Sequence, residues 1–196
     1  LTLNTPVLLT GSTLYTNTLT SNVSPTNAIF LGSNAGNNAN SSDYSTFLGS
    51  NAGNGATTAN YSNFLGQNAG YLASGANHSN FIGSQAGWRA SNAFGSHFIG
   101  SNAGYQASEG YYSIFIGEAA GQSSTNANSS NFIGYYAGQA ATNASGSNFI
   151  GYYTGVNALN ASYSVLLGYR AGVAVGTGIG ANNIIIGTNI TLPEGM

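Results

Sequence analysis

The sequence predicts an all-β protein, a parallel β-solenoid whose backbone winds once for every copy of a short repeat. Three observations predict this fold. A motif with two glycines recurs nine times across residues 29–181, and the interval between successive copies never changes. Eight of the nine phenylalanines occupy the same place in the motif. Only 3% of the residues are charged, which suits a fold in which equivalent side chains stack on their copies.

The glycines of the repeat predict its corners. Each repeat is numbered here from position 1 to position 17, so that the first runs from Ile29 to Ser45 and makes one coil. Glycine stands at positions 4 and 8 of every repeat, and it allows a positive φ or a close approach of two backbones. We therefore expect tight corners at Gly32, Gly36, Gly49, Gly53, Gly66, Gly70, Gly83, Gly87, Gly100, Gly104, Gly117, Gly121, Gly134, Gly138, Gly151, Gly155, Gly168 and Gly172.

Two apolar columns run through the repeats. Position 3 is always Leu or Ile, from Leu31 to Leu167. Neighbouring residues of a strand point to opposite faces, so positions 2 and 3 cannot both enter the coil. Either column could fill the interior, and the other must then point outward. The column at position 2, which we expect in the core of the coil or of an oligomer, is Phe30, Phe47, Phe64, Phe81, Phe98, Phe115, Phe132, Phe149 and Leu166.

A helical repeat fits this pattern poorly. Repeats made of helix pairs need about 33 to 47 residues. Glycine also costs a helix about 1 kcal/mol per residue. In a solenoid the columns stack at the strand spacing of about 4.8 Å, so nine coils would extend roughly 43 Å. No column contains two charged residues, which avoids repulsion between stacked copies.

The outward apolar column predicts self-association. Nine Leu and Ile residues, or nine aromatic ones, would form an exposed stripe of several hundred Å², which monomers rarely tolerate. Cyclic association would bury that stripe on a shared axis. We expect three chains, arranged as a side-by-side or intertwined homotrimer.

The repeat boundaries divide the chain into three parts. Residues 1–28 carry no repeat, and their alternation of Thr and Leu predicts β-rich structure that leads into the solenoid or caps it. Residues 29–181 form the nine coils. Residues 182–196 resemble a degenerate last coil followed by an exit segment. Because the chain begins at Leu1 without a basic and apolar leader, we expect a processed product or a piece of a longer protein.

Composition argues against several function classes. Two arginines cannot form the basic stripe that nucleic acids require. No apolar run reaches the roughly 20 residues of a membrane helix, so we expect no membrane insertion. Cysteine is absent, and His78 and His97 fall in different columns, so we expect no metal and no cofactor. Glu109 and Glu118 are expected on different sides of a coil, and we expect no enzyme activity.

One group of side chains is a candidate contact site. Tyr71, Trp88 and Tyr105 occupy position 9 in three successive repeats, and Arg89 follows the tryptophan. These rings could form a platform for a sugar or another receptor, with Arg89 bonding its hydroxyl groups. The other interpretation is an aromatic ladder that only stabilises stacked coils. The same two interpretations apply to the pairs Tyr135–Tyr136 and Tyr152–Tyr153.

The repeat also resembles known families. Its pattern Ser-Asn-Phe-Ile-Gly-x-x-Ala-Gly-x-x-Ala is similar to the head repeats of trimeric autotransporter adhesins. It looks closer still to the Asn-Thr-Phe-Leu-Gly-x-x-Ala-Gly arrays of bacterial surface and phage tail-fibre proteins, many of which end in an endosialidase-type chaperone domain. The resemblance covers residues 29–181, although autotransporter repeats are usually shorter. It implies a left-handed β-roll, a homotrimer, and a role in attachment on a cell surface or a virion.

These observations predict a structural or adhesive module of an extracellular fibre, either an adhesin of the cell surface or the shaft or head of a tail fibre. Its expected partners are its own copies and a host-cell glycan or surface receptor. The alternative is an ice-binding β-solenoid, since flat and neutral solenoids can order water. That role favours a regular row of Thr, whereas position 12 mixes Asn, Thr, Ser, Leu and Gly.

Overall fold

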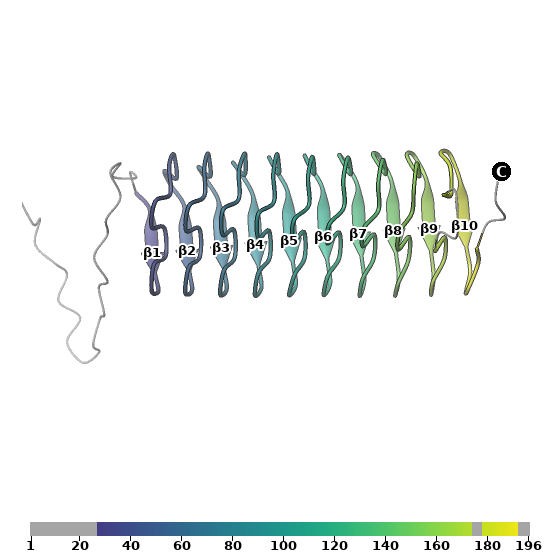
Figure 1. Ribbon diagram of the computed structural model, residues 1–196, viewed down its shortest axis with the longest axis horizontal. Helices are drawn as coiled ribbons and strands as arrows, with labels where there is room; N and C mark the ends of the chain where they lie inside the picture. Colours follow the sequence, from purple (N-terminus) through teal and green to yellow (C-terminus); the bar gives the residue numbers. More distant parts are fainter. Residues whose placement is uncertain (1–26, 174–177, 192–196) are drawn as a thin grey trace, which may run out of the picture.

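The structure, a computed structural model, describes residues 27–173 and 178–191. These residues form a parallel β-solenoid in which ten short strands follow one another along a single sheet (Figure 1). The lead-in predicted for residues 1–28 lies almost wholly outside the described residues, as do residues 192–196 of the exit segment. The strands are β1 (Ile29–Leu31), β2 (Thr46–Leu48), β3 (Asn63–Leu65), β4 (Asn80–Ile82), β5 (His97–Ile99), β6 (Ile114–Ile116), β7 (Asn131–Ile133), β8 (Asn148–Ile150), β9 (Val165–Leu167) and β10 (Ile184–Ile186).

The strand register confirms that one repeat of the sequence makes one coil. Phe30 pairs with Phe47, Phe47 with Phe64, and the same offset continues as far as β9. The last coil is two residues longer, because Ile185 of β10 pairs with Leu166. Each strand covers only positions 1–3 of its repeat. A second line of parallel bridges joins position 12 of successive coils, and turns make up most of the rest.

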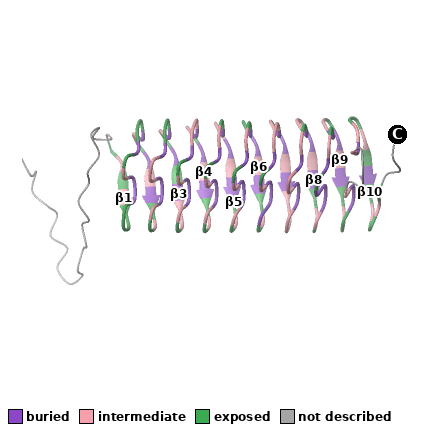
Figure 2. Cartoon of the chain, viewed as in Figure 1, coloured by how far each residue is buried: buried purple, intermediate pink, exposed green. Residues whose placement is uncertain are grey.

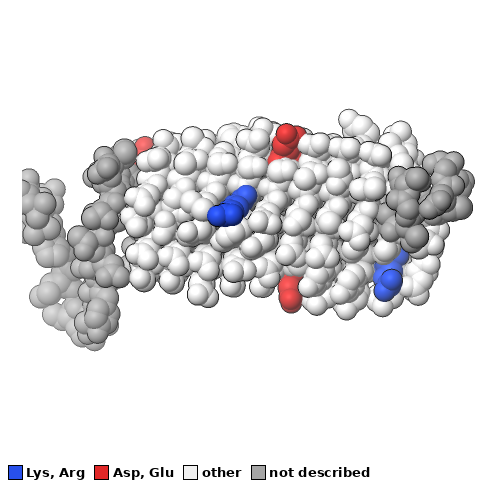
Figure 3. All heavy atoms as spheres, viewed as in Figure 1, with Lys and Arg blue, Asp and Glu red and all other residues white. Residues whose placement is uncertain are grey.

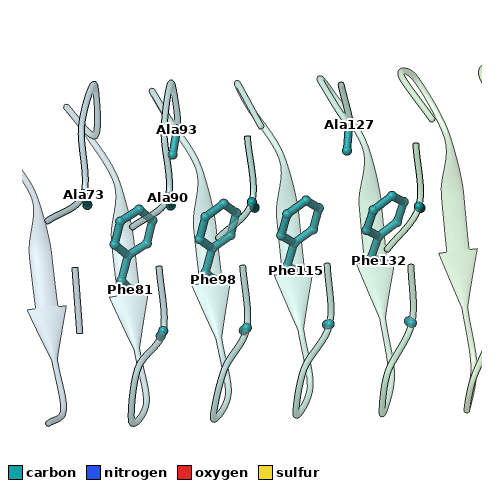
Figure 4. Packing of buried hydrophobic residues seen from close by; sticks show 14 of the residues in the cluster. Ala73, Phe81, Ala90, Ala93, Phe98, Phe115, Ala127 and Phe132 are labelled. Carbon is teal, nitrogen blue, oxygen red and sulfur yellow. The ribbon is translucent and has the colours of Figure 1, made fainter. Parts of the chain in front are cut away.

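The phenylalanine column fills the interior of the coil. Phe47 through Phe149 are fully buried at position 2, whereas positions 1 and 3 of each strand are half-buried or exposed (Figure 2). Neighbouring rings stack with centroids 4.6–4.9 Å apart. The alanines of positions 7, 11 and 14 line the remaining space, and Figure 4 shows them around the rings. Rings stacked on rings and packed against methyl groups give a thin core with no room for larger side chains.

The glycines at positions 4 and 8 serve two different contacts. Gly53 has φ 62°, and a Cβ there would overlap the ring of Phe47 in its own coil. Gly49 has φ 134°, and a Cβ there would overlap the carbonyl of Gly66 in the next coil. Position 8 therefore makes space for the core, and position 4 lets adjacent coils approach. Both need a backbone conformation that glycine adopts at little cost.

A serine ladder at position 17 ties the coils together inside the core. The Oγ of Ser62 donates to the carbonyl oxygen of Ala76 in the next coil, at 2.6 Å. The same oxygen accepts the backbone N–H of Ser79, at 3.1 Å. Every serine of this column is buried, and most repeat the same pair of bonds. The hydroxyl groups thus satisfy polar backbone groups that the short strands leave unpaired.

Much of each turn is built from residues other than glycine in the left-handed conformation. Positions 6, 10, 13 and 16 adopt φ near 50–60° in most coils, as at Asn51, Tyr61 and Arg89. This conformation costs roughly 1–2 kcal/mol for a residue with a Cβ. Each of these three residues donates its backbone N–H to a carbonyl of the preceding coil, at 2.7–2.9 Å. Bonds between coils offset the cost, which is why the turns accept tyrosine and arginine as well as asparagine.

Candidate functional site

The outward side chains of the ten strands form an apolar surface along the whole solenoid, which we call the sheet face. The side chains at position 3 run along the middle of this surface. Leu48 is 48% exposed and Ile99 is 37% exposed, although both belong to regular strands. The Leu and Ile side chains at position 3 that stand exposed are Leu31, Leu48, Ile82, Ile99, Ile116, Ile150, Leu167 and Ile186. Monomeric soluble proteins rarely expose a continuous apolar row of this length.

The polar residues of the sheet face already bond to one another. At position 1, the Asn63 amide donates to Asn80 at 2.8 Å, and Asn131 donates to Asn148 at 2.7 Å. The Asn80 amide nitrogen lies 2.9 Å from Nδ1 of His97, so His97 takes part in the same ladder. No Lys, Arg, Asp or Glu occupies position 1 or 3 in any strand. Covering this face would therefore leave few polar groups without partners.

The predicted aromatic group forms a stacked ladder. The Trp88 ring lies 6.1 Å from the ring of Tyr71 and 4.6 Å from that of Tyr105, with planes within 9° of parallel. Both faces of the indole therefore meet neighbouring rings. Outside contacts therefore fall mainly to the ring edges and the tyrosine hydroxyl groups, and little of the Trp88 face is left for a sugar.

Arg89 adds a charge to this ladder. Its Cζ lies 4.5 Å from the centroid of the Trp88 ring, and its side chain is exposed. Leu72 precedes Arg89 in the column at position 10, and Gln106 follows it; both are exposed. The structure thus brings together the four residues that the sequence singled out, Tyr71, Trp88, Arg89 and Tyr105, on one side of the solenoid.

A second aromatic cluster lies in the C-terminal third. Tyr135, Tyr152 and Tyr169 stack at position 5, with centroids 5.0 and 5.4 Å apart. Tyr136 and Tyr153 stack beside them at 5.1 Å. Desolvation by neighbouring side chains, together with repulsion from Tyr136 and Glu118, raises the pKa of Tyr135 above its ordinary value of 10.0. Desolvation, followed by the charge of Tyr153, raises the pKa of Tyr152 in the same way.

The two histidines make different contacts. His78 stacks on Tyr61 with centroids 5.0 Å apart, whereas His97 belongs to the asparagine ladder. In the described part of the chain, no group of three or more His, Cys, Asp or Glu side chains could hold a metal ion. None of the described residues belongs to a helix long and apolar enough to span a membrane.

The sequence pattern did not reveal that the serine ladder, and a set of asparagines at position 15, bond to the backbone of the neighbouring coil. There, Oδ1 of Asn60 accepts the backbone N–H of Asp43, and Oδ1 of Asn77 accepts that of Asn60, both at 2.8 Å. The recurrence of Asn at this position was the available signal. These contacts give the asparagines a structural role.

Comparison with protein-family models and with curated protein sequences finds no match. The likeness to adhesin and tail-fibre repeats therefore depends on the repeat motif.

Proposed function

We propose that the chain is a structural and adhesive module of an extracellular fibre, carried by a cell surface or a virion, and that it works as a homotrimer without catalysing a reaction. The observation that carries the proposal is the sheet face. A rigid, neutral rod that exposes an apolar row along its length is suited to side-by-side assembly with its own copies.

The sheet face supports self-assembly in three ways. The strands stack in register (Figure 1), so the exposed Leu and Ile residues at position 3 follow one another in one row. Its asparagine amides are paired along the ladder, so burying them costs little. It carries no acidic residue and no Lys or Arg, so identical faces do not repel one another. A cyclic arrangement lets each chain present the same row to a common axis.

The number of chains and the hand of the coil come from the resemblance. Repeats of the adhesin-head and tail-fibre type imply three chains and a left-handed coil. In this proposal the sheet faces meet at the centre of the fibre. The aromatic ladder and the tyrosine cluster then remain available for a glycan or a surface receptor on the host.

Attachment is tested directly with purified chain. The labelled protein is applied to arrays of host-type cells and immobilised glycans, and saturable binding that unlabelled protein displaces is the expected result. A chain that binds none of these surfaces saturably would contradict the adhesive role. Thermal hysteresis of the same sample is expected to be absent, and its presence would favour the ice-binding alternative.

A further inference from the structure

The geometry points to Arg89 and Trp88 as the centre of a binding site for an acidic saccharide, whose carboxylate pairs with the guanidinium. This inference rests on the proposed function and names the class of ligand that this side of the fibre would take. It depends on three features: an arginine without an ionic partner, a stacked aromatic ladder that holds it in place, and polar and apolar neighbours that suit a sugar ring.

Arg89 is an isolated positive charge on a nearly uncharged surface. Figure 3 shows a few separate charged side chains on an otherwise neutral rod. Among residues 27–173 and 178–191, no salt bridge joins Arg89 to a carboxylate. A guanidinium without a partner keeps its N–H groups available for an incoming anion, and it binds a carboxylate through two parallel hydrogen bonds.

The ladder fixes the arginine before any ligand arrives. The backbone N–H of Arg89 donates to the carbonyl oxygen of Tyr71 at 2.8 Å. The guanidinium carbon lies 4.5 Å from the Trp88 ring centroid, a cation–π distance. Trp88 is in turn held by Tyr105, whose ring centroid is 4.6 Å away. An arginine whose backbone and guanidinium group are both already held loses less conformational entropy when it binds a ligand.

The neighbours of Arg89 offer the contacts that a saccharide uses. Gln106, one coil further on in the same column, exposes an amide that can donate to and accept from hydroxyl groups. Leu72, one coil earlier, exposes an apolar side chain for C–H groups. The hydroxyl groups of Tyr71 and Tyr105 complete a shallow surface about three coils long. A linear saccharide lying along the solenoid axis would contact these residues in succession.

Trp88 provides the readout, because it is the single tryptophan of the chain. Its fluorescence, excited at a wavelength that spares tyrosine, is followed during titration with an oligomer of a uronic acid. The same oligomer with its carboxyl groups reduced to alcohols is the ligand control. We expect the Trp88 fluorescence to change saturably with the acidic oligomer, and the affinity to fall at high salt. The reduced oligomer is expected to bind at least tenfold more weakly. Equal binding of the two oligomers, or no saturable change with the acidic one, would overturn the assignment.

Variants of the two arginines localise the effect. Arg89→Gln is expected to weaken binding of the acidic oligomer at least tenfold, and Arg89→Lys to retain part of it as a single point charge. Arg170→Gln is the matched control. It removes the same charge from the second arginine of the chain, which has the same left-handed backbone conformation. Wild-type affinity in Arg89→Gln, or an equal loss in Arg170→Gln, would contradict the site. If the wild type attaches to surfaces but ignores the acidic oligomer, the inference fails while the proposed function stands.

Discussion

At the scale of single residues, the interior of the coil is packed so tightly that one methyl group fits at some glycines and overlaps a ring at others. Position 14 is alanine in most coils, but it is glycine at Gly110. A Cβ added there would lie 3.5 Å from Cζ of Phe98 and 3.9 Å from Cε2 of Phe115, which are ordinary van der Waals contacts. Unlike the glycines of positions 4 and 8, Gly110 has no positive φ. The fold does not require glycine at this place.

Gly110→Ala should therefore stabilise the protein by about 1 kcal/mol, through a less flexible unfolded chain and an additional buried methyl group. Thermal unfolding followed by circular dichroism measures the effect.

Gly104→Ala is the opposing control, because a Cβ there would overlap the ring of Phe98 at φ 62°. It should destabilise the protein by about 2–5 kcal/mol, from the left-handed backbone and the overpacked core. A destabilised Gly110→Ala, or a Gly104→Ala as stable as the wild type, would contradict this packing.

The buried serines allow a second prediction at this scale. Ser62→Ala would leave the N–H of Ser79 and the carbonyl of Ala76 without the hydroxyl that bonds both. Each unsatisfied buried group costs about 1–3 kcal/mol, so the two together predict a loss of about 2–6 kcal/mol in urea unfolding. The exposed Ser84→Ala is the control and should change stability by less than about 0.5 kcal/mol. A loss in Ser62→Ala no larger than in the control would show that the ladder contributes little.

At the scale of elements, each column is a ladder whose neighbours are its own copies. This arrangement explains how much of the structure the sequence could predict. The constant interval between repeats determined the register, so the stacking of Phe47 on Phe64 and the absence of paired charges could be read directly. The sequence did not show whether the phenylalanine column faces the interior or the outside, because positions 2 and 3 are both apolar. In the structure, the small alanines of the coil lie on the same side of the strand as position 2. They leave room for a phenylalanine ring in the interior.

The turns and the candidate site were harder to predict for a related reason. Nothing in an isolated Tyr61 or Arg89 indicates a left-handed backbone, since the bond that stabilises it comes from the preceding coil. The sequence did bring Tyr71, Trp88 and Tyr105 into one column. The sequence did not show that the rings of Tyr71 and Tyr105 stack on the two faces of Trp88.

The tyrosine cluster gives a prediction at this scale. The pKa values of Tyr135 and Tyr152 are raised in the folded state. Their contribution to stability is therefore complete below the ordinary tyrosine pKa, and it declines as pH rises through the raised values, because the unfolded chain ionises first. Unfolding should accordingly become easier above about pH 10. Phenolate absorbance and circular dichroism, recorded together in an alkaline titration, follow both events.

Replacing both residues, as in Tyr135→Phe with Tyr152→Phe, should reduce this alkaline loss of stability. Tyr163→Phe, outside the cluster, should leave it as in the wild type. An alkaline transition unchanged by the double substitution would assign the effect to other groups.

At the scale of the whole molecule, a rod with a buried aromatic spine exposes a second apolar row on the opposite side of the same strands. Interior packing cannot remove this row, because alternate residues of a strand face opposite directions. The sheet face must therefore be covered by other chains or remain in contact with water. We propose that three copies of the chain cover it.

Charges placed on the sheet face should separate the copies. Ile82→Lys with Ile116→Lys puts lysines at two exposed positions that one coil separates, so the fold of each chain should persist while like charges oppose assembly. Thr57→Lys with Ser91→Lys adds the same charge at position 12, away from the sheet face, and should assemble like the wild type. Dissociation of both double variants, or of neither, would argue against the sheet face as the interface.

Sedimentation equilibrium of the wild-type chain at micromolar concentration tests the central claim most directly. The predicted result is a single species with three times the chain mass of 19.8 kDa. A folded species with the mass of one chain at every concentration would contradict it, because the exposed row of Leu and Ile would then need no partner.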